Sequence, residues 1–253
     1  MAALPFGRLR LTRLPLLLLL LGGMPTGLRA AEPPAAGALA REQQEQRQRF
    51  VGVWALVDNA NNLFNVRLSN DGRAISTAGT SGVPLGGSTQ LRAKQLYEQG
   101  RWQPWGNGVR IDYGDGWSDA LLTGPGGLLQ WSWAPGVSRL GAPSNHGKAV
   151  QLGGAMAEAV GIYRIQPAQA ELPVTTVSLM SNGLAFNAID QLAGGTWRLE
   201  DAEVVITWSS GWVTRFQPKA NGPLQVRIWE PAKRHPSPPT AIRPGYRLET
   251  SAP

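Results

Sequence analysis

The sequence contains no cysteine and only two histidines in 253 residues. The missing thiols exclude a cysteine nucleophile, an iron–sulfur cluster and a zinc site built from cysteines. An exported domain of roughly 200 residues needs no disulfides, because it can bury an adequate core. Both histidines, His146 and His235, lie in proline-rich stretches expected to be loops, and neither belongs to a spaced metal-binding motif. We therefore predict no metal site, no cofactor and no catalytic residue.

Charged side chains are also scarce, at 16% of the chain, and the net charge of +7 is unevenly distributed. Residues 1–30 carry four of the 24 basic residues and no acid, which leaves 20 basic and 17 acidic residues, a net charge of +3. That balance is ordinary for a protein surface, so we predict no nucleic-acid partner. One basic cluster in a proline-rich stretch is expected to be solvated and consists of Lys233, Arg234, Arg243 and Arg247.

Residues 1–30 have the layout of a Sec-type signal peptide. Arginines precede the apolar run Leu14–Met24, and small residues around Ala30 offer a cleavage site. The run is short for a membrane span of about 20 residues, although an uncleaved anchor is the alternative. We predict export to the periplasm, the thylakoid lumen or the extracellular space, with no membrane span in the mature chain.

The remainder of the chain contains one unit twice. Trp102 and Trp197 are 95 residues apart, as are Trp117 and Trp212. The spacing from Gly52 to Gly161 is 109, so the first copy has about 14 extra residues, which we place in a Gly/Ser/Thr-rich loop at 76–90. The predicted organisation is a signal peptide at 1–30, a linker with a short polar helix at 31–49, a first β repeat at 50–153, a connector at 154–160 and a second β repeat at 161–250.

Each copy has the pattern of a string of short hairpins. Asx-Gly pairs such as Asp71-Gly72 suit tight turns, and the segments between them alternate with period two. Val109, Ile111 and Tyr113, for example, share one face of a predicted strand. We predict an all-β fold, a tandem duplication of a seven- to eight-stranded antiparallel meander. Two small barrels are the first choice, and one larger barrel or a bent sandwich are the alternatives.

The segment Phe50–Trp54 follows a short helical stretch and resembles the Gly-x-Trp opening strand of lipocalins and related calycin barrels. The resemblance covers these five residues and the overall layout, and the Thr-Asp-Tyr motif of that family is absent. It implies that Trp54 closes one end of a barrel and that Arg247 packs across Tyr163 in the second copy. It also implies a small apolar ligand inside a barrel.

Tryptophan is abundant, with ten residues against five phenylalanines and four tyrosines. Most of them are expected in the core, because a small barrel interior is filled by inward aromatic side chains. An exposed indole face would instead stack on a sugar ring. The candidate ligand-binding residues are Trp54, Trp102, Trp117, Trp133, Tyr163, Trp197, Trp212 and Trp229.

Acidic residues offer one alternative chemistry. Three aspartates surround the turn at Gly116-Trp117, where they could bind a hard cation or form an acid–base pair. The matching positions of the second copy hold no acid, so we expect turn formation and solvent contact instead. The acids that an enzyme would use are Asp112, Asp115, Asp119, Glu200, Asp201 and Glu203.

Three functions therefore stay open. The preferred one is an exported, non-enzymatic binding protein of the cell envelope, with a small apolar molecule or a carbohydrate in a Trp-rich barrel. The second is a structural or protein-interaction module that works through its surfaces. The third is a hydrolase or isomerase that uses clustered carboxylates at a barrel mouth. The sequence makes no prediction of the oligomeric state.

Overall fold

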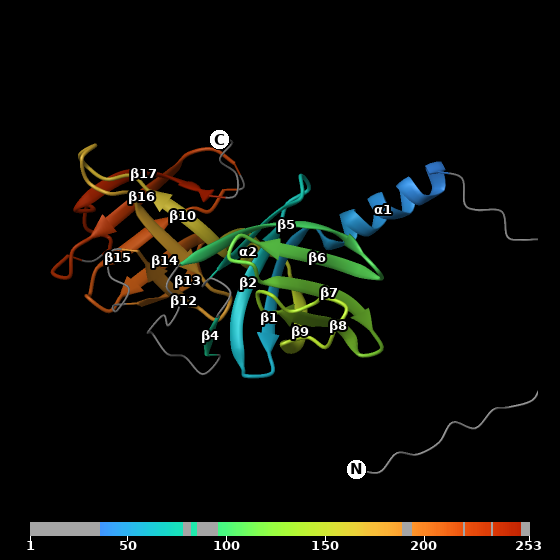
Figure 1. Ribbon diagram of the computed structural model, residues 1–253. Helices are drawn as coiled ribbons and strands as arrows, with labels where there is room; N and C mark the ends of the chain where they lie inside the picture. The colour runs from blue at the N-terminus through green and yellow to red at the C-terminus, as the bar shows by residue number, and fades with distance from the viewer. Residues whose placement is uncertain are drawn as a thin grey trace, which may run out of the picture.

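The computed structural model describes residues 36–77, 82–84, 96–188, 194–219, 221–233 and 235–248. They form two antiparallel β-barrels side by side, with a longer helix at the far end of the first barrel (Figure 1). The all-β prediction of two small barrels is thereby confirmed, and one larger barrel is excluded because the two sheets close separately. The signal segment and most of loop 76–90 lie outside the described residues.

The first barrel closes with eight strands in the order β1-β9-β8-β7-β6-β5-β3-β2, because β2 pairs back with β1. A ninth strand, β4, is two residues long and pairs with the start of β2. The strands are β1 Gly52–Asp58, β2 Asn62–Leu68, β3 Arg73–Thr77, β4 Val83–Pro84, β5 Tyr97–Trp105, β6 Gly108–Tyr113, β7 Ser118–Gly124, β8 Gly127–Trp133 and β9 Asn145–Leu152.

The second barrel closes with eight strands in chain order, from β10 to β17. Its last strand pairs with its first, as β9 pairs with β1 in the first barrel. The strands are β10 Gly161–Ile165, β11 Thr175–Leu179, β12 Leu184–Asn187, β13 Gly195–Glu200, β14 Glu203–Trp208, β15 Val213–Phe216, β16 Leu224–Trp229 and β17 Ala241–Arg247.

The described residues include two helices besides the barrels. The polar helix α1, Ala36–Phe50, projects away from the first barrel (Figure 1), and its last residue Phe50 is buried in that barrel's core. The short helix α2, Gly154–Ala159, connects the barrels. Among the described residues, neither helix combines the length and the apolar character needed to span a membrane.

Local sequence explains why these hairpins form. On β6, Val109, Ile111 and Tyr113 are buried in the core, whereas Arg110 and Asp112 on the opposite face remain partly exposed. The turns between strands use glycine where the backbone is left-handed, as at Gly72 with φ +83° and its repeat partner Gly183 with φ +82°. Alternating burial and matched turns therefore give both copies the same meander.

One end of each barrel closes around an equivalent aromatic residue. Trp54 Nε1 donates to the carbonyl of Phe50 at 2.9 Å, and Tyr163 Oη donates to the carbonyl of Ala159 at 2.7 Å. Arg247 lies across the ring of Tyr163, with Cζ 5.2 Å from the ring centroid, as the sequence resemblance implies. The expectation that Arg247 is solvated is wrong, because only 3% of this residue is exposed.

The barrels contact each other through the outer face of β1 and β2. Val53 packs in the core cluster of the second barrel, and Leu63 packs against residues of β12 and its preceding turn. Asn65 exchanges two hydrogen bonds with Ser181: its Nδ2 donates to Ser181 Oγ at 2.8 Å, and its Oδ1 accepts from the Ser181 amide at 2.9 Å. Arg67 donates to carbonyl oxygens of α2 and the residue after it. The helix that joins the copies is thus held by both apolar and polar contacts.

Candidate functional site

Most of the predicted ligand-binding aromatics are structural. Trp54, Trp102, Tyr163 and Trp197 belong to the barrel cores. The indole of Trp102 donates to the carbonyl of Ser69 at 2.8 Å, and that of Trp197 donates to the repeat-matched carbonyl of Met180 at the same distance. Their polar atoms are therefore already used inside the protein.

Trp133 and Trp229 are also buried, but they lie outside the two barrel core clusters. Trp133 Nε1 donates to the carbonyl of Gly141 at 3.2 Å, and Trp229 Nε1 donates to the carbonyl of Ser237 at 2.8 Å. Both acceptors belong to the loop after the strand, so this loop covers the indole. The two tryptophans are repeat-matched, with a spacing of 96 residues.

Trp117 and Trp212 follow the equivalent turn glycines and are the most open of the eight candidates. Trp117 is half-buried against the first core, and Trp212 is 39% exposed. Their positions at the ends of the barrels leave part of each indole accessible. The structure therefore does not gather the eight aromatics into one site.

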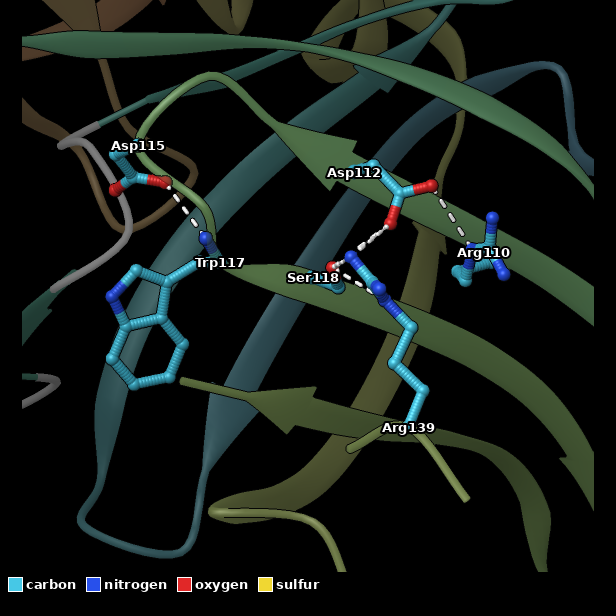
Figure 2. Close-up of polar contacts among 6 residues, drawn as sticks. All are labelled: Arg110, Asp112, Asp115, Trp117, Ser118 and Arg139. Carbon is cyan, nitrogen blue, oxygen red and sulfur yellow. Dashed lines mark hydrogen bonds and ion pairs between the residues drawn. The ribbon is translucent and has the colours of Figure 1, made fainter. Parts of the chain in front are cut away.

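The three aspartates near the Gly116 turn point in different directions. Asp112 lies on the outer face of β6, where its Oδ2 accepts from Arg110 Nε at 3.0 Å and its Oδ1 pairs with Arg139 Nη2 at 2.8 Å. Ser118 Oγ donates to the same Oδ1 at 2.9 Å (Figure 2). Asp115 caps the turn by accepting the amide of Trp117 at 3.1 Å (Figure 2). Asp112 therefore faces away from Asp119, whereas the charge of Asp115 acts on Asp119 and helps to raise its pKa.

Asp119 instead lies inside the first barrel and is only 4% exposed. It is on β7 two residues before the core residue Leu121, and its backbone is paired with that of the core residue Ile111. Its Oδ2 accepts a hydrogen bond from Tyr113 Oη at 3.0 Å. The expectation that this aspartate faces water is therefore wrong, because the register of the β6–β7 hairpin turns it inward.

Two further polar side chains reach Asp119 from β8. Ser132 Oγ donates to Asp119 Oδ1, and Gln130 Nε2 donates to the same oxygen at 3.4 Å. Gln130 is fully buried, and its Oε1 has no hydrogen-bond partner among the residues that the structure describes. We call Tyr113, Asp119, Gln130 and Ser132 the interior polar cluster. On β8 the inward face is thus the polar one, whereas the tryptophan face lies outside the barrel core.

Burial gives this cluster unusual proton affinities. Burial raises the pKa of Asp119 to about 6, although hydrogen bonds from Ser132, Tyr113 and Gln130 act to lower it. Burial and the nearby Asp119 carboxylate raise the pKa of Tyr113 well above its ordinary value, so its hydroxyl stays protonated. A carboxyl group with a pKa displaced by burial inside a barrel is a feature typical of functional sites.

The second barrel has no such cluster at the matching positions. Thr214 replaces Asp119, and Trp208 replaces Tyr113, with the indole donating to Thr214 Oγ1 at 3.0 Å. Val226 and Ile228 stand where the first barrel has Gln130 and Ser132. Its interior is therefore apolar where the first barrel carries an ionisable group.

The acids of the second copy are surface ion pairs. Glu200 pairs with Arg198 at 2.5 Å and with Arg215 at 3.0 Å, and Glu203 pairs with Arg215 and Arg227. Asp201 occupies a turn with φ +49°. No group of three or more His, Asp or Glu residues among the described residues could hold a metal ion. These acids do not converge on a pocket with the interior polar cluster.

The two histidines also lie apart. His146 is exposed on β9, which corrects the expectation that it lies in a loop. His235 is exposed in the loop after β16, with its ring 6.0 Å from that of Trp229. Neither histidine is hydrogen-bonded to the interior polar cluster.

Comparisons with known proteins supply no family. No protein-family model matches the chain, and no curated protein matches it. Among solved structures, BamB from Moraxella catarrhalis is similar over 69% of this chain, at 12% identity and with a TM-score of 0.15. The chain spans 60% of the length of that structure. A TM-score this low gives no ground for transferring a fold or a function.

Proposed function

We propose that the chain is an exported, non-enzymatic binding protein whose first barrel holds a small molecule against the interior polar cluster. The carrying observation is the buried carboxyl group of Asp119, which has no counterpart in the second barrel. The export component rests on the signal-like residues 1–30. The second barrel acts as a support for the first.

The energetic contrast between the copies favours a ligand role for the cluster. A buried ionisable group is unfavourable compared with well-packed apolar side chains. The second barrel closes with Thr214, Val226 and Ile228 at these positions, so the fold itself does not require a carboxyl group there. Ligand binding would explain why the first barrel keeps a polar cluster that costs stability and that the second barrel lacks.

The cluster also constrains the ligand class. Gln130 Oε1 is a buried acceptor without a partner, and Asp119 is a second acceptor beside it. Asp119 already accepts three hydrogen bonds within the protein, whereas a purely apolar ligand would leave Gln130 Oε1 unpaired, which is costly away from water. We therefore favour a small molecule with hydroxyl groups, such as a carbohydrate, over a hydrocarbon.

A hydrolase function has less support than a binding function. Asp119, with a pKa of about 6, suits general acid–base chemistry at neutral pH. A glycosidase-type mechanism needs a second carboxylate facing the first. Asp112 is instead paired with arginines on the outer face, and Asp115 caps a turn. The binding function requires only the groups that the interior brings together.

Native mass spectrometry of the protein isolated from its source tests this proposal. We expect a bound small molecule on the wild type that dissociates on denaturation. The double variant Asp119→Leu, Gln130→Leu should lose it, because both acceptors are removed and the interior becomes like that of the second barrel. The matched control Thr214→Val should retain it. A wild type without bound mass, or a double variant that keeps it, would contradict the proposal.

The same spectra test export. The intact mass of the isolated protein is expected to correspond to a chain that begins after Ala30 or Ala31. A mass that includes residues 1–30 would support the uncleaved anchor instead.

A further inference from the structure

A cleft of about 800 Å³ lies where the two barrels meet. One wall comes from β3, β5 and the turn before β3, and the other comes from β10 and the end of β17. Its volume is in the range of pockets that take small molecules, and such pockets are frequent at domain junctions. It is separate from the interior polar cluster, none of whose members lines it.

The first-barrel wall places two arginines side by side. Arg73 and Arg101 are directly opposite in the β3–β5 ladder, and both lie on the outer face because their neighbours Ala74 and Trp102 point into the core. Like charges directly opposite in a sheet are destabilising. Asp71 pairs with Arg73, Oδ2 to Nε at 2.6 Å, whereas Arg101 has no ion pair within 4.0 Å among the described residues.

The second barrel adds a third arginine to the cleft. Arg164 lies on the outer face of β10, opposite Tyr246 of β17. Its Nη2 donates to Tyr97 Oη at 3.3 Å across the junction, and its buried Nε has no hydrogen-bond partner within the described part of the chain. The described lining residues thus include three arginines and one carboxylate, Asp71, so the cleft has an excess of positive charge.

A cleft of about 470 Å³ on the second barrel shows what a charge-matched surface looks like in the same molecule. Its arginines, Arg198 and Arg215, both pair with Glu200, and Arg215 also pairs with Glu203. The third cation of its lining, Lys233, pairs with Glu230, so each of these three positive side chains has a carboxylate partner within the protein. The junction cleft lacks comparable carboxylates among its described residues.

We propose that the junction cleft binds a small organic anion. Its carboxylate or phosphate oxygens contact Arg73, Arg101 and Arg164, since the guanidinium group binds both kinds of oxyanion through paired N–H donors. Its carbon skeleton lies against Ile75 and Leu248, which also line the cleft. Because the wall comes from both barrels, the bound anion bridges them.

Calorimetric titration of the full protein at low ionic strength with citrate, and separately with pyrophosphate, tests this site. We expect at least one probe to bind with one-to-one stoichiometry. The variants Arg101→Gln and Arg164→Gln should each weaken that binding about tenfold, since each removes charge-assisted hydrogen bonds. The control Arg41→Gln removes a charge from the exposed face of α1 and should leave the affinity within about twofold.

The two probes identify the anionic group, because binding of citrate alone indicates a carboxylate ligand and binding of pyrophosphate alone indicates a phosphate ligand. The proposal is overturned if neither probe saturates. It is also overturned if Arg101→Gln, which removes no contact between the barrels, binds as tightly as the wild type. An equal loss in Arg41→Gln would show a diffuse charge effect and would overturn it as well. None of these variants touches the interior polar cluster, so the outcome is independent of the proposed function.

Discussion

The two barrels close one end in the same way with different side chains. In the second barrel the buried Arg247 donates to the carbonyl of Val160 at 2.9 Å and to Tyr163 Oη at 3.0 Å. In the first barrel Gln151, at the same register position, donates to the carbonyl of the matching residue Val51 at 3.1 Å. The hydrogen bond to this carbonyl is kept in both copies, while charge and burial differ.

The interiors differ in a more consequential way. The ring of the first barrel surrounds a carboxyl group with three hydrogen-bonding partners, whereas the second surrounds a Trp208–Thr214 pair among aliphatic side chains. Both rings have eight strands with antiparallel pairing. The comparison shows that the strand pattern and the turns specify the barrel, whereas the side chains inside it can differ between the two copies.

Substitution of the side chains that close the barrel ends is expected to change the free energy of unfolding most. Arg247→Met should lower the free energy of unfolding by about 4 kcal/mol, because buried hydrogen bonds of a charged group to α2 and Tyr163 are lost. Gln151→Met should cost about 1 kcal/mol or less, since Gln151 is exposed. Urea unfolding followed by tryptophan fluorescence measures both. Equal losses of unfolding free energy in the two variants would contradict a greater contribution of Arg247 than of Gln151.

The interior difference predicts a pH dependence of stability that arises from Asp119 and is absent from the second interior. Because the pKa of Asp119 in the folded protein is raised from 3.8 to about 6, the folded state binds more protons than the unfolded state between those values. The free energy of unfolding should therefore fall by about 2 kcal/mol from this group as the pH rises from about 4 to 7. Asp119→Asn should lack this fall. Urea unfolding across that range, wild type against variant, checks it, and a constant difference would contradict it.

Matched glycines test whether the ladders are equivalent. An added Cβ would lie 2.6 Å from the carbonyl oxygen of Asp112 at Gly100 and 2.7 Å from that of Thr207 at Gly195. Gly100→Ala and Gly195→Ala should each cost about 2 kcal/mol, because the backbones must separate. Thermal unfolding of the two variants provides the measurement. Tolerance of one substitution and not the other would show that the β5–β6 and β13–β14 ladders differ.

The second interior should respond weakly and without pH dependence. Thr214→Val removes the acceptor for the Trp208 indole and should cost about 1 kcal/mol. The cost should be the same at pH of about 4 and 7, since no ionisable group is involved. Urea unfolding at both values measures it. A cost that varies with pH would mean that the second interior also contains a titrating group.

The architecture was predictable because its signals are local. Turn glycines such as Gly72 and Gly116 and the alternation around Val109 and Ile111 are visible in short windows, and their repetition shows the duplication. Those signals predict an antiparallel meander of seven to eight strands in each copy, and each closed ring of the structure has eight.

The interior polar cluster was not predictable in the same way. Asp112, Asp115 and Asp119 are equally close to the turn, and only the pairing register decides which one enters the barrel. Period-two alternation separates Trp131 and Trp133 of β8 from Gln130 and Ser132. It does not show which face is inward, because the loop that covers Trp133 is not visible in the strand pattern. One signal was available in the sequence: Asp119 is two residues from the apolar Leu121, and residues two apart on a strand point to the same side of the sheet.

A carbon-13 NMR titration of the Asp119 carboxyl group, assigned by comparison with Asp119→Asn, tests the central claim most directly. We predict a pKa of about 6, the value expected for a carboxyl group sealed inside the first barrel. A pKa near 4, as for an aspartate in water, would contradict the account, because the first barrel would then hold no buried ionisable group to distinguish it from the second.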